Sequence, residues 1–391
     1  MLLLGVASGL SPFGITMAVP VLTSIAAQFQ AEFSTVQFVI SAYILGLALA
    51  QPFSGFLCDQ FGRRPVMLAG FAMFVVASAL AAWVDSLAGL ITARFLQAAG
   101  VSVGTVASRA VVRDTRGPRQ TTEAMSYIAA VTGLAPITAP VLGGWLGLLG
   151  GYRLVFIVSA AMGLLVLVMM YRTLPETLDR SAAPPRLGRI MHNYLLLMKS
   201  RLFLGFSLMF GFVQGGFFAF MAVGAAVFQD DLGLAENWFG TVWGLMAVSY
   251  MLSAMASGRA VRFFGSARVM GIAIVIHIAA GFLLIIAAKM GITAVNLVTG
   301  LTFVMASAGV IIPGSLAGAV NAHPEMAGTA SGLSSALGLA LGGSFTVLAG
   351  VLYQGSFASI AWLIVVSTSL TALSWLMVRR MATAQSEESS G

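Results

Sequence analysis

Residues 55–65 read Gly-Phe-Leu-Cys-Asp-Gln-Phe-Gly-Arg-Arg-Pro, a charged turn that contains two glycines and lies between two long apolar runs. A degraded copy follows about 203 positions further along, where Gly258, Arg262 and Gly265 repeat the spacing glycine-x3-charge-x2-glycine, with Arg268 shortly after. One such turn indicates a loop between two membrane helices. Two of them, half a chain apart, predict a duplicated helical bundle, the architecture of many secondary transporters.

The composition indicates a membrane protein. Charged residues make up 8% of the 391 residues and hydrophobic ones 59%, whereas soluble domains carry roughly 25% charged residues because their surface faces water. The 44 glycines fit helices in lipid, where small residues let backbones approach closely. The single cysteine, Cys58, excludes an intramolecular disulfide. The first apolar run continues for about 25 residues, so it predicts a membrane span rather than a signal peptide.

Hydropathy along the chain predicts twelve spans and one long polar interruption. Windows of about 20 residues place the spans near residues 2–27, 36–57, 66–84, 87–109, 123–147, 154–173, 202–228, 238–260, 269–288, 293–318, 327–352 and 357–378. We therefore predict an all-α membrane protein with 12 transmembrane helices in two pseudo-symmetric six-helix bundles. The predicted divisions are an N-terminal bundle 1–174, a cytoplasmic linker 175–201, a C-terminal bundle 202–380 and a polar cytoplasmic tail 381–391.

The placement of positive charge predicts the orientation. Of the 20 lysines and arginines, all except Arg94, Arg153 and Lys289 fall at one side of the predicted spans. Because cytoplasmic loops are enriched in these residues, we expect both termini in the cytoplasm of a bacterium and the spans in its inner (plasma) membrane. The net charge of +7 is then a signal of topology, and no nucleic-acid partner is expected.

The charged turn at residues 55–65 has two interpretations, a gate of the transport path and an ordinary loop. Gly62 can adopt a positive φ and turn the chain sharply. Asp59 can cap a helix N-terminus or bind an arginine. The alternative is an ordinary short cytoplasmic loop that carries Arg63 and Arg64 only because of the positive-inside rule.

Four motifs follow one another along the N-terminal half. They are Tyr43-x7-Gln51-x3-Gly55-x3-Asp59-x2-Gly62-Arg63-Arg64-Pro65, the Arg-x-x-Gln-x-x-Gly run at 94–100, the proline- and glycine-containing run at 133–144 and Pro-Glu-Thr-Leu at 175–178. With these motifs the N-terminal half resembles the major facilitator superfamily, most of all the bicyclomycin and phenicol resistance efflux pumps among drug:proton antiporters, and the run at 133–144 resembles the antiporter motif of exporters. The C-terminal half is similar mainly in hydropathy and in the repeated turn.

The resemblance implies roles for these motifs. Arg94 and Gln97 would line the central cavity and take part in coupling, although a buried arginine can also snorkel or tie spans together through carbonyl groups. The antiporter motif would form a seal or hinge, with a simple packing kink as the alternative. The implied gating residues are Gly55, Asp59, Gly62, Arg63, Arg64, Arg262, Gly265 and Arg268, and the implied antiporter-motif residues are Gly133, Pro136, Pro140, Gly143 and Gly144.

The resemblance also implies that spans 1, 4, 7 and 10 surround the cavity. Polar and aromatic residues of these spans, with Tyr43 of span 2, are therefore candidate substrate contacts. Most phenylalanines of such a chain pack against lipid or other helices, and this interpretation stays open for each aromatic candidate. Besides Arg94 and Gln97, the candidates are Thr16, Met17, Tyr43, Gln214, Phe217, Phe218, Asn296, Thr299 and Thr302.

One departure from the family concerns proton coupling. Related pumps usually carry an acid in span 1, where this chain has Thr16, and none of the 13 acidic residues lies well inside a predicted span. Three alternatives stay open. Glu32 or Asp59 titrates at a gate, His277 carries the proton, or the chain does not couple to protons in the usual way. An uncompensated Arg94 favours a neutral or anionic substrate over a cation.

We therefore expect a secondary active transporter that exports a small, largely apolar, neutral or weakly acidic compound, such as an antibiotic, by alternating access with proton coupling. Two alternatives are an exporter or facilitator of an anionic metabolite that uses Arg94 as counter-charge, and a receptor or regulator that keeps the fold without transporting. The sequence shows no enzyme motif, no nucleotide-binding loop and no metal-ligand spacing. We expect no cofactor, no metal, and a monomer whose partners are the substrate, protons and the lipid bilayer.

Overall fold

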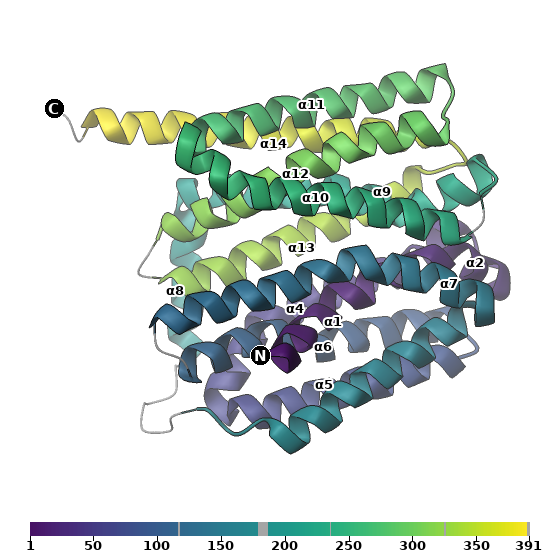
Figure 1. Ribbon diagram of the computed structural model, residues 1–391, viewed down its shortest axis with the longest axis horizontal. Helices are drawn as coiled ribbons and strands as arrows, with labels where there is room; N and C mark the ends of the chain where they lie inside the picture. The colour runs from purple at the N-terminus through teal and green to yellow at the C-terminus, as the bar shows by residue number, and fades with distance from the viewer. Residues whose placement is uncertain (116–117, 179–186, 235, 324–325, 389–391) are drawn as a thin grey trace. The chain divides into compact units, whose positions relative to one another are not determined.

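The computed structural model describes residues 1–115, 118–178, 187–234, 236–323 and 326–388 (Figure 1). Throughout these ranges the regular elements are helices, which confirms the prediction of an all-α protein. Eleven helical segments of the described residues are long and apolar enough to cross a membrane. One of them, Thr138–Thr173, runs through a break at Gly150 and Gly151 and so holds parts of two predicted spans.

The first six spans are built from seven α-helices and one 3-10 turn. Span 1 is interrupted, because Pro20 lacks an N–H and lies in the 3-10 turn that separates two α-helices. The elements are α1 (Leu2–Thr16), η1 (Val19–Val21), α2 (Leu22–Phe29), α3 (Phe33–Val36), α4 (Phe38–Phe61), α5 (Arg63–Trp83), α6 (Leu87–Thr115) and α7 (Pro118–Thr173). Helix α7 comprises spans 5 and 6, which are divided where Gly151 adopts a φ of 63°.

The remaining elements begin inside the predicted linker. Helix α8 shows that part of the linker is helical, and α14 continues through most of the predicted tail, as far as Glu388. The elements are α8 (Leu187–Lys199), α9 (Arg201–Ala226), η2 (Val227–Asp231), α10 (Glu236–Phe264), α11 (Ser266–Met290), α12 (Ala294–Asn321), α13 (Ala327–Leu352) and α14 (Phe357–Glu388). Element η2 is a single π-helical turn, a form often found at functional positions.

Contacts between residues divide the chain into two units. The first unit comprises Met1–Leu187 with Gly224–Gly244, and the second comprises Gly188–Val223 with Leu245–Gly391. The division predicted from the sequence stays a prediction. The contacts add that the end of α9 and the beginning of α10 group with the N-terminal helices.

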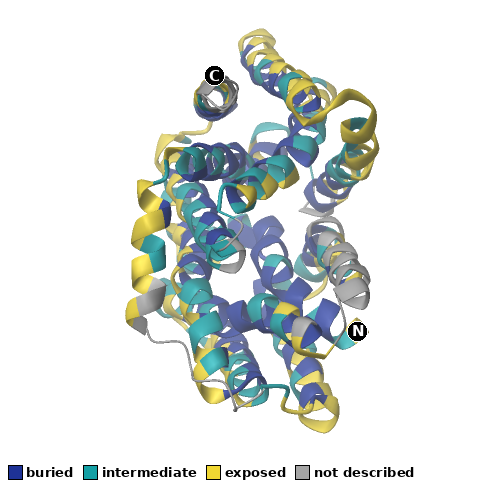
Figure 2. Cartoon of the chain, turned by 90° about the vertical axis from the view of Figure 1, so that its left-hand side faces the viewer, coloured by how far each residue is buried: buried dark blue, intermediate teal, exposed yellow. Residues whose placement is uncertain are grey.

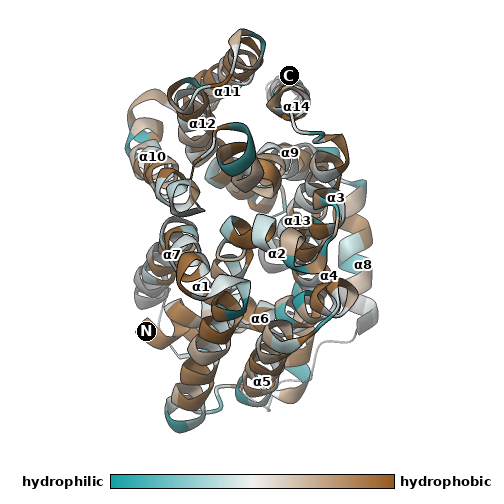
Figure 3. Cartoon of the chain, turned by 90° about the vertical axis from the view of Figure 1, so that its right-hand side faces the viewer, coloured by the Kyte–Doolittle hydropathy of each residue, from teal (hydrophilic) through white to brown (hydrophobic). Residues whose placement is uncertain are grey.

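Within each unit, helices pack through one face and leave the other exposed (Figure 2). In the first unit α4 and α5 pack against α6, and α1 packs against α7, while in the second α11 packs against α12 and α14. Large apolar side chains such as Val76, Leu165 and Val275 are exposed. Figure 3 shows hydrophobic colour along the bodies of many helices and hydrophilic colour at several of their ends. Exposed apolar faces of this kind are stable only in contact with lipid.

Candidate functional site

Arg94 lies in the interior of the first unit. The side chain is on α6 and is 1% exposed. Its Nε donates to the carbonyl oxygen of Val39 at 3.2 Å, and Nη2 donates to that of Gly14 at 2.9 Å. Nη1 donates to Oε1 of Gln97 at 2.5 Å. The guanidinium thus connects spans 1, 2 and 4.

Two aromatic rings surround the same guanidinium. The Cζ atom of Arg94 lies 4.1 Å from the ring centroid of Tyr43 and 5.6 Å from that of Phe156. A cation near the face of an aromatic ring is stabilised by the ring quadrupole, most of all where water is excluded. The hydroxyl of Tyr43 donates to the carbonyl oxygen of Ser11 at 3.1 Å, which holds the ring in place.

Gln97 extends the network to span 3. Its Nε2 donates to Oγ of Ser78 at 2.7 Å, and that hydroxyl donates to the carbonyl oxygen of Phe74 at 2.6 Å. Among the described residues, no carboxylate contacts Arg94. The contacts fit the interpretation in which Arg94 ties spans together, and its part in coupling stays a prediction.

Thr16 and Met17 lie beside this network without a bond to Arg94. The hydroxyl of Thr16 donates to the carbonyl oxygen of Pro12, one turn earlier, at 3.1 Å. Both side chains are buried. The carbonyl oxygen of Met17 lies so close to Gly143 that a Cβ at this glycine would collide with it. Gly143 is therefore needed for the close approach of α7 to the end of span 1.

The antiporter motif makes a second close approach, to the beginning of α10. A Cβ at Gly240 would collide with the carbonyl oxygen of Pro140, which is buried. Gly133 and Pro136 are in α7, but their surroundings lie outside the described part of the chain. Gly144 is buried on the same helix. The described half of the motif thus forms packing contacts that only glycine permits.

A polar contact that the sequence analysis missed lies at the predicted periplasmic end of the first unit. Gln229, in the π-turn η2, donates from Nε2 to the carbonyl oxygen of Pro20 at 3.1 Å. The hydroxyl of Thr23 donates to Oε1 of Gln229. Gln229 directly follows the predicted span 7 and precedes Asp230 and Asp231, so it gave no distinct signal in the sequence. We call these bonds of Gln229 with Pro20 and Thr23 the outer contact.

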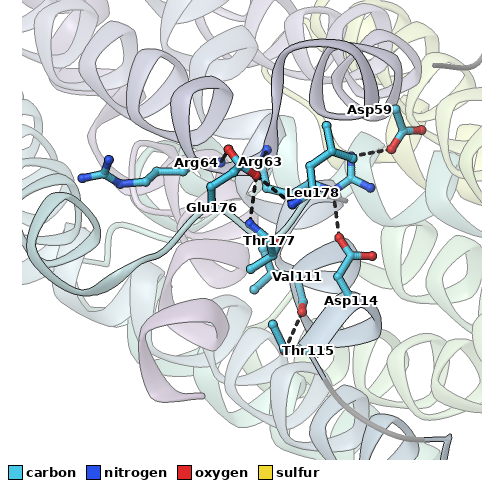
Figure 4. A network of polar contacts seen from close by, with 9 residues as sticks. All are labelled: Asp59, Arg63, Arg64, Val111, Asp114, Thr115, Glu176, Thr177 and Leu178. Atoms are coloured by element: carbon cyan, nitrogen blue, oxygen red, sulfur yellow. Dashed lines mark hydrogen bonds and ion pairs between the residues drawn. The ribbon is translucent and has the colours of Figure 1, made fainter. Parts of the chain in front are cut away.

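At the predicted cytoplasmic end, Arg63 is the centre of a charged network (Figure 4). Its Nη1 pairs with Oδ1 of Asp59, and its Nε donates to Oδ2 of Asp114 at 3.1 Å. Arg63 is 3% exposed, so both carboxylates balance a charge that water does not reach. Asp114, at the end of α6, was not among the candidates. The network joins the ends of spans 2, 3 and 4.

Glu176 completes the network by capping α5. Its carboxylate accepts from the N–H groups of Arg63 at 2.9 Å and Arg64 at 3.3 Å, and from those of Thr177 and Leu178, both at 2.9 Å (Figure 4). Partial burial raises the pKa of Glu176, but the four donors outweigh burial and lower the pKa below its ordinary value. The Pro-Glu pair after span 6 was the signal in the sequence.

Arg64 points away from the carboxylates. Its Nη2 donates to the carbonyl oxygen of Tyr171 at 3.0 Å. Its Cζ lies 5.6 Å from the centroid of the Tyr171 ring. Gly55 faces the side chain of Val106, and a Cβ there would lie in ordinary contact at 3.6 Å. The two residues therefore pack spans 2, 3, 4 and 6 together at this end.

The second turn repeats the backbone of the first but not its chemistry. Gly62 has φ 105° and ψ 153°, and Gly265 has φ 80° and ψ 150°. Each glycine precedes the first residue of a helix, α5 or α11. Arg262 and Arg268 are exposed, and neither has an ion-pair partner among the described residues. The duplicated backbone therefore carries a charge-balanced network in one copy only.

The candidates on spans 7 and 10 have local contacts. Phe217 and Phe218 are edge to face, with centroids 5.2 Å apart. Asn296 forms a capping box with Thr293 at the beginning of α12. The hydroxyls of Thr299 and Thr302 each donate at 2.7 Å to a carbonyl oxygen four residues earlier. The side chain of Gln214 is half-buried. Their contact with a substrate stays a prediction.

His277 is buried on α11 in the second unit. Its Nδ1 lies 2.8 Å from Oγ of Ser307, while Nε2 has no hydrogen-bond partner among the described residues. The hydroxyl of Ser307 also donates to two carbonyl oxygens of its own helix, those of Phe303 at 2.8 Å and Val304 at 2.9 Å. The hydroxyl of Ser307 thus helps to hold the buried His277 side chain in place. The part of the chain that the structure describes holds no group of three or more possible metal ligands.

The chain is similar to known transport proteins over most of its length. A family model described as the Major Facilitator Superfamily matches residues 4–347. The bicyclomycin resistance protein homolog of Haemophilus influenzae is 30% identical over 342 residues, which cover 87% of this chain and 86% of that protein. Multidrug resistance protein D of Escherichia coli is 28% identical over 362 residues, 92% of this chain and 91% of that protein.

Two solved structures have a similar fold at low identity. The crystal structure of a D-xylose-proton symporter superposes with a TM-score of 0.74 at 14% identity and covers 96% of each chain. The crystal structure of the human organic anion transporter MFSD10 gives a TM-score of 0.70 at 20% identity, over 96% of this chain and 98% of the other. At these identities the likeness concerns the fold alone.

Proposed function

This chain belongs to the Major Facilitator Superfamily and is a multi-pass membrane transporter, and we propose that it exports a small, largely apolar, neutral or weakly acidic compound by alternating access. Relatives named for bicyclomycin resistance and multidrug resistance support efflux as the direction of transport and drugs as the substrate class. The same relatives are bacterial, which supports the bacterial inner membrane as the location. The distribution of arginines supports cytoplasmic termini.

The charge at Arg94 carries the proposal for the substrate. The guanidinium is buried and is bonded to carbonyl and amide oxygens rather than to a carboxylate. A buried positive charge without a counter-ion repels a cation, because the surrounding dielectric constant is low. A lipophilic cation would therefore bind less well than a neutral compound or a weak acid.

The same observation supports a second candidate, the export of an anionic metabolite with Arg94 as counter-charge. The two candidates differ in the charge of the substrate at neutral pH. A panel of neutral, weakly acidic and anionic compounds, tested against cells that express the chain, distinguishes them. Protection against neutral drugs favours the first candidate, and export of anions alone favours the second. A receptor without transport activity would protect against none of them.

For alternating access, contacts within the first unit must open and close. The outer contact and the approach of Gly240 to Pro140 hold the end of α9 and the start of α10 against the N-terminal helices. The rest of α9 and α10 belongs to the second unit. We propose that these contacts close the periplasmic side and break when the carrier faces outward, while the Arg63 network gates the cytoplasmic side.

We propose protons as the coupling ion and a monomer as the working unit. Two groups support a proton-binding step: Asp59, which belongs to the Arg63 network, and His277, whose Nε2 has no hydrogen-bond partner among the described residues. Glu32 is the third candidate and lies in the loop before α3. Vesicles with an imposed pH gradient provide the test. Substrate accumulation that follows the gradient supports antiport, and accumulation that ignores it refutes proton coupling.

A further inference from the structure

His277 lies near the middle of helix α11. From Ser266, the first residue of α11, the helix rises about 16 Å to His277, which is close to half of the roughly 30 Å of a hydrocarbon layer. The side chain is 1% exposed. Coupling ions of secondary transporters bind near this depth. The position therefore suits a group that binds and releases an ion.

The hydrogen bonds around the ring define which nitrogen of His277 is free. The hydroxyl of Ser307 has one hydrogen, which it donates to the carbonyl oxygens of Phe303 and Val304 in its own helix. Its oxygen can therefore only accept from Nδ1 of His277, at 2.8 Å. The carbonyl oxygen of Val304, which also contacts the ring, is an acceptor as well. The hydrogen of the neutral ring thus lies on Nδ1, and Nε2, with no partner in the part of the chain that the structure describes, keeps a bare lone pair.

The helices that pack against α11 bring no charged group to the depth of His277. These helices are α12 and α14 (Figure 1), and the sequence has no ionisable side chain in 294–321 or in 357–378. Thr368 of α14 offers a hydroxyl one turn away, where a Cβ at Gly281 would lie 2.9 Å from its Oγ1. Tyr250 of α10 borders the apolar cluster formed by α9, α11 and α12. An imidazolium at this depth would therefore have no counter-ion in α12 or α14. The charged residues of α11 and α14 stand toward their ends and are Arg268, Lys289, Arg379, Arg380, Glu387 and Glu388.

His277 differs from the other two candidate proton sites in its access to water. Glu32 is exposed in the loop before α3. The side chain of Asp59 is 37% exposed and is paired with Arg63. Both carboxylates can therefore exchange protons with water while the helices are packed as observed. A coupling site must instead be open to one side of the membrane at a time, and a group enclosed by helices, as His277 is, meets this requirement.

We propose that His277 binds the coupling proton at Nε2, and that its access to water depends on the packing of α12 against α11. A proton from water forms an N–H bond with the lone pair of Nε2 and gives the ring one positive charge. While α11 and α12 are packed, an imidazolium without a counter-ion is unfavourable, so the proton returns to water. The assignment rests on the proposed function, because it names the group that carries the proposed proton coupling.

Helix α12 connects this proton site to the expected substrate site. It is the predicted span 10 and carries the candidate substrate contacts Thr299 and Thr302 as well as Ser307. A displacement of α12 by the substrate therefore also changes the surroundings of His277. Substrate and proton can then exclude each other, as antiport requires, without a direct contact between them.

The tautomer of His277 gives a first test, which needs no transported compound. The full chain is labelled with ¹⁵N in its histidines and reconstituted in liposomes. Subtraction of the His277→Asn spectrum from that of the parent isolates the two ring nitrogens. At pH 7 we expect a hydrogen on Nδ1 and a bare Nε2, and Ser307→Ala, which removes the acceptor, should populate the other tautomer. A hydrogen on Nε2 in the parent would overturn the proposal, because that nitrogen could then accept no proton.

Transport in vesicles tests the role of the site, with bicyclomycin, the compound for which one relative is named, as the probe. A gradient of about one pH unit supports roughly tenfold accumulation in one-for-one exchange. His277→Asn keeps a short N–H donor for Ser307 but cannot titrate, so we expect this accumulation to be lost while bicyclomycin still moves down its own gradient. His192→Asn makes the same change at an exposed histidine of α8 and should leave accumulation unchanged.

Several outcomes overturn the assignment. Accumulation that survives in His277→Asn excludes His277, and its loss in Glu32→Gln or Asp59→Asn then moves the proton site to that carboxylate. Loss of downhill movement together with accumulation in His277→Asn shows a structural role. A parent that carries bicyclomycin but ignores the pH gradient refutes proton coupling, and with it the role of His277. A parent that carries no bicyclomycin contradicts this substrate alone, and the tautomer still decides whether Nε2 is a proton acceptor.

Discussion

The side-chain amide of Gln229 donates to the carbonyl oxygen of Pro20 at 3.1 Å, which joins the π-turn η2 to the break in span 1. Pro20 lacks the N–H that would continue the helix and lies in the 3-10 turn that interrupts span 1. The break in span 1 therefore contains the carbonyl oxygen that accepts the side chain of Gln229 from η2. If the carrier opens at this end, the bond must break in every cycle.

Gln229→Ala is expected to favour the outward-open state. The change removes the bonds to Pro20 and Thr23, which contribute about 1 kcal/mol each, so the equilibrium should shift by roughly 10-fold or more. Spin labels on the cysteines of Glu32→Cys and Trp238→Cys, in a Cys58→Ser background, report the distance between the loop before α3 and the beginning of α10. Gln28→Ala, at an exposed position of α2, is the control. An unchanged distance distribution in Gln229→Ala would contradict a gating role.

Substitution of Arg94 is expected to stop transport, even when the charge is kept. Arg94→Ala leaves the acceptors at Gly14, Val39 and Gln97 without a donor, at about 1–3 kcal/mol for each buried group. Arg94→Lys has one nitrogen and cannot reach all three oxygens. We expect at least tenfold lower flux in vesicles and a lower Tm for both variants. Normal flux with a lower Tm would assign Arg94 a structural role alone.

The two turns allow a matched test of the charged network. Arg63→Gln removes the positive charge that pairs with Asp59 and Asp114 and should lower the free energy of unfolding by about 2–4 kcal/mol. Arg262→Gln, at the exposed position of the second turn that corresponds to Asp59, should change it by about 0.5 kcal/mol or less. Thermal unfolding in detergent compares the two variants. Similar losses in both would show that the network does not stabilise the first turn.

Glycine is required for different reasons in the two turns. Gly265→Ala meets no atom within 4 Å, so only the positive φ is unfavourable, at about 1–3 kcal/mol. Gly62→Ala has the same strain and also brings a Cβ into collision with the carboxylate of Glu176. We expect Gly62→Ala to lower Tm more than Gly265→Ala. The combined variant Gly62→Ala with Glu176→Ala should recover part of the difference.

Glu176 gives a pH dependence of defined sign. Its pKa is lower in the folded protein than in the unfolded chain, so the charged cap contributes stability above the ordinary value of about 4.3. That contribution is lost as the pH falls through the lowered pKa. Tm should be higher in the parent than in Glu176→Gln at pH 7, and the difference should vanish at the lowest pH. Glu32→Gln, at an exposed position, is the control.

Much of the fold followed from local features of the sequence. A span is a run of about 20 apolar residues, and each predicted span is helical in the structure. The turn at Gly62 and its copy at Gly265 were visible because a sharp reversal between helices needs glycine, and both adopt a positive φ. The family was visible for the same reason, since its motifs are short and continuous.

The partners of the site residues were less visible, because they come from helices far apart in the sequence. Arg94 was identified as an arginine within a span, but its acceptors at Gly14 and Val39 are backbone carbonyls that any residue type can supply. Asn296, a candidate at the cavity, has its amide in a capping box that its position in the sequence alone did not indicate, and its contact with a substrate stays a prediction. Gln229 gave no distinct signal, because it stands in a polar group with Asp230 and Asp231 at the end of span 7.

By itself, the sequence determined the number of spans, the duplication, the family and the unbalanced charge of Arg94, since hydropathy and turn chemistry are local properties of the chain. Tertiary structure alone decided which groups satisfy each polar side chain. It placed Glu176 on the N-terminus of α5, Arg63 between two carboxylates and Gln229 on Pro20. In a bilayer a buried polar group must find its partner within the protein, and only helix packing determines which groups come within bonding distance.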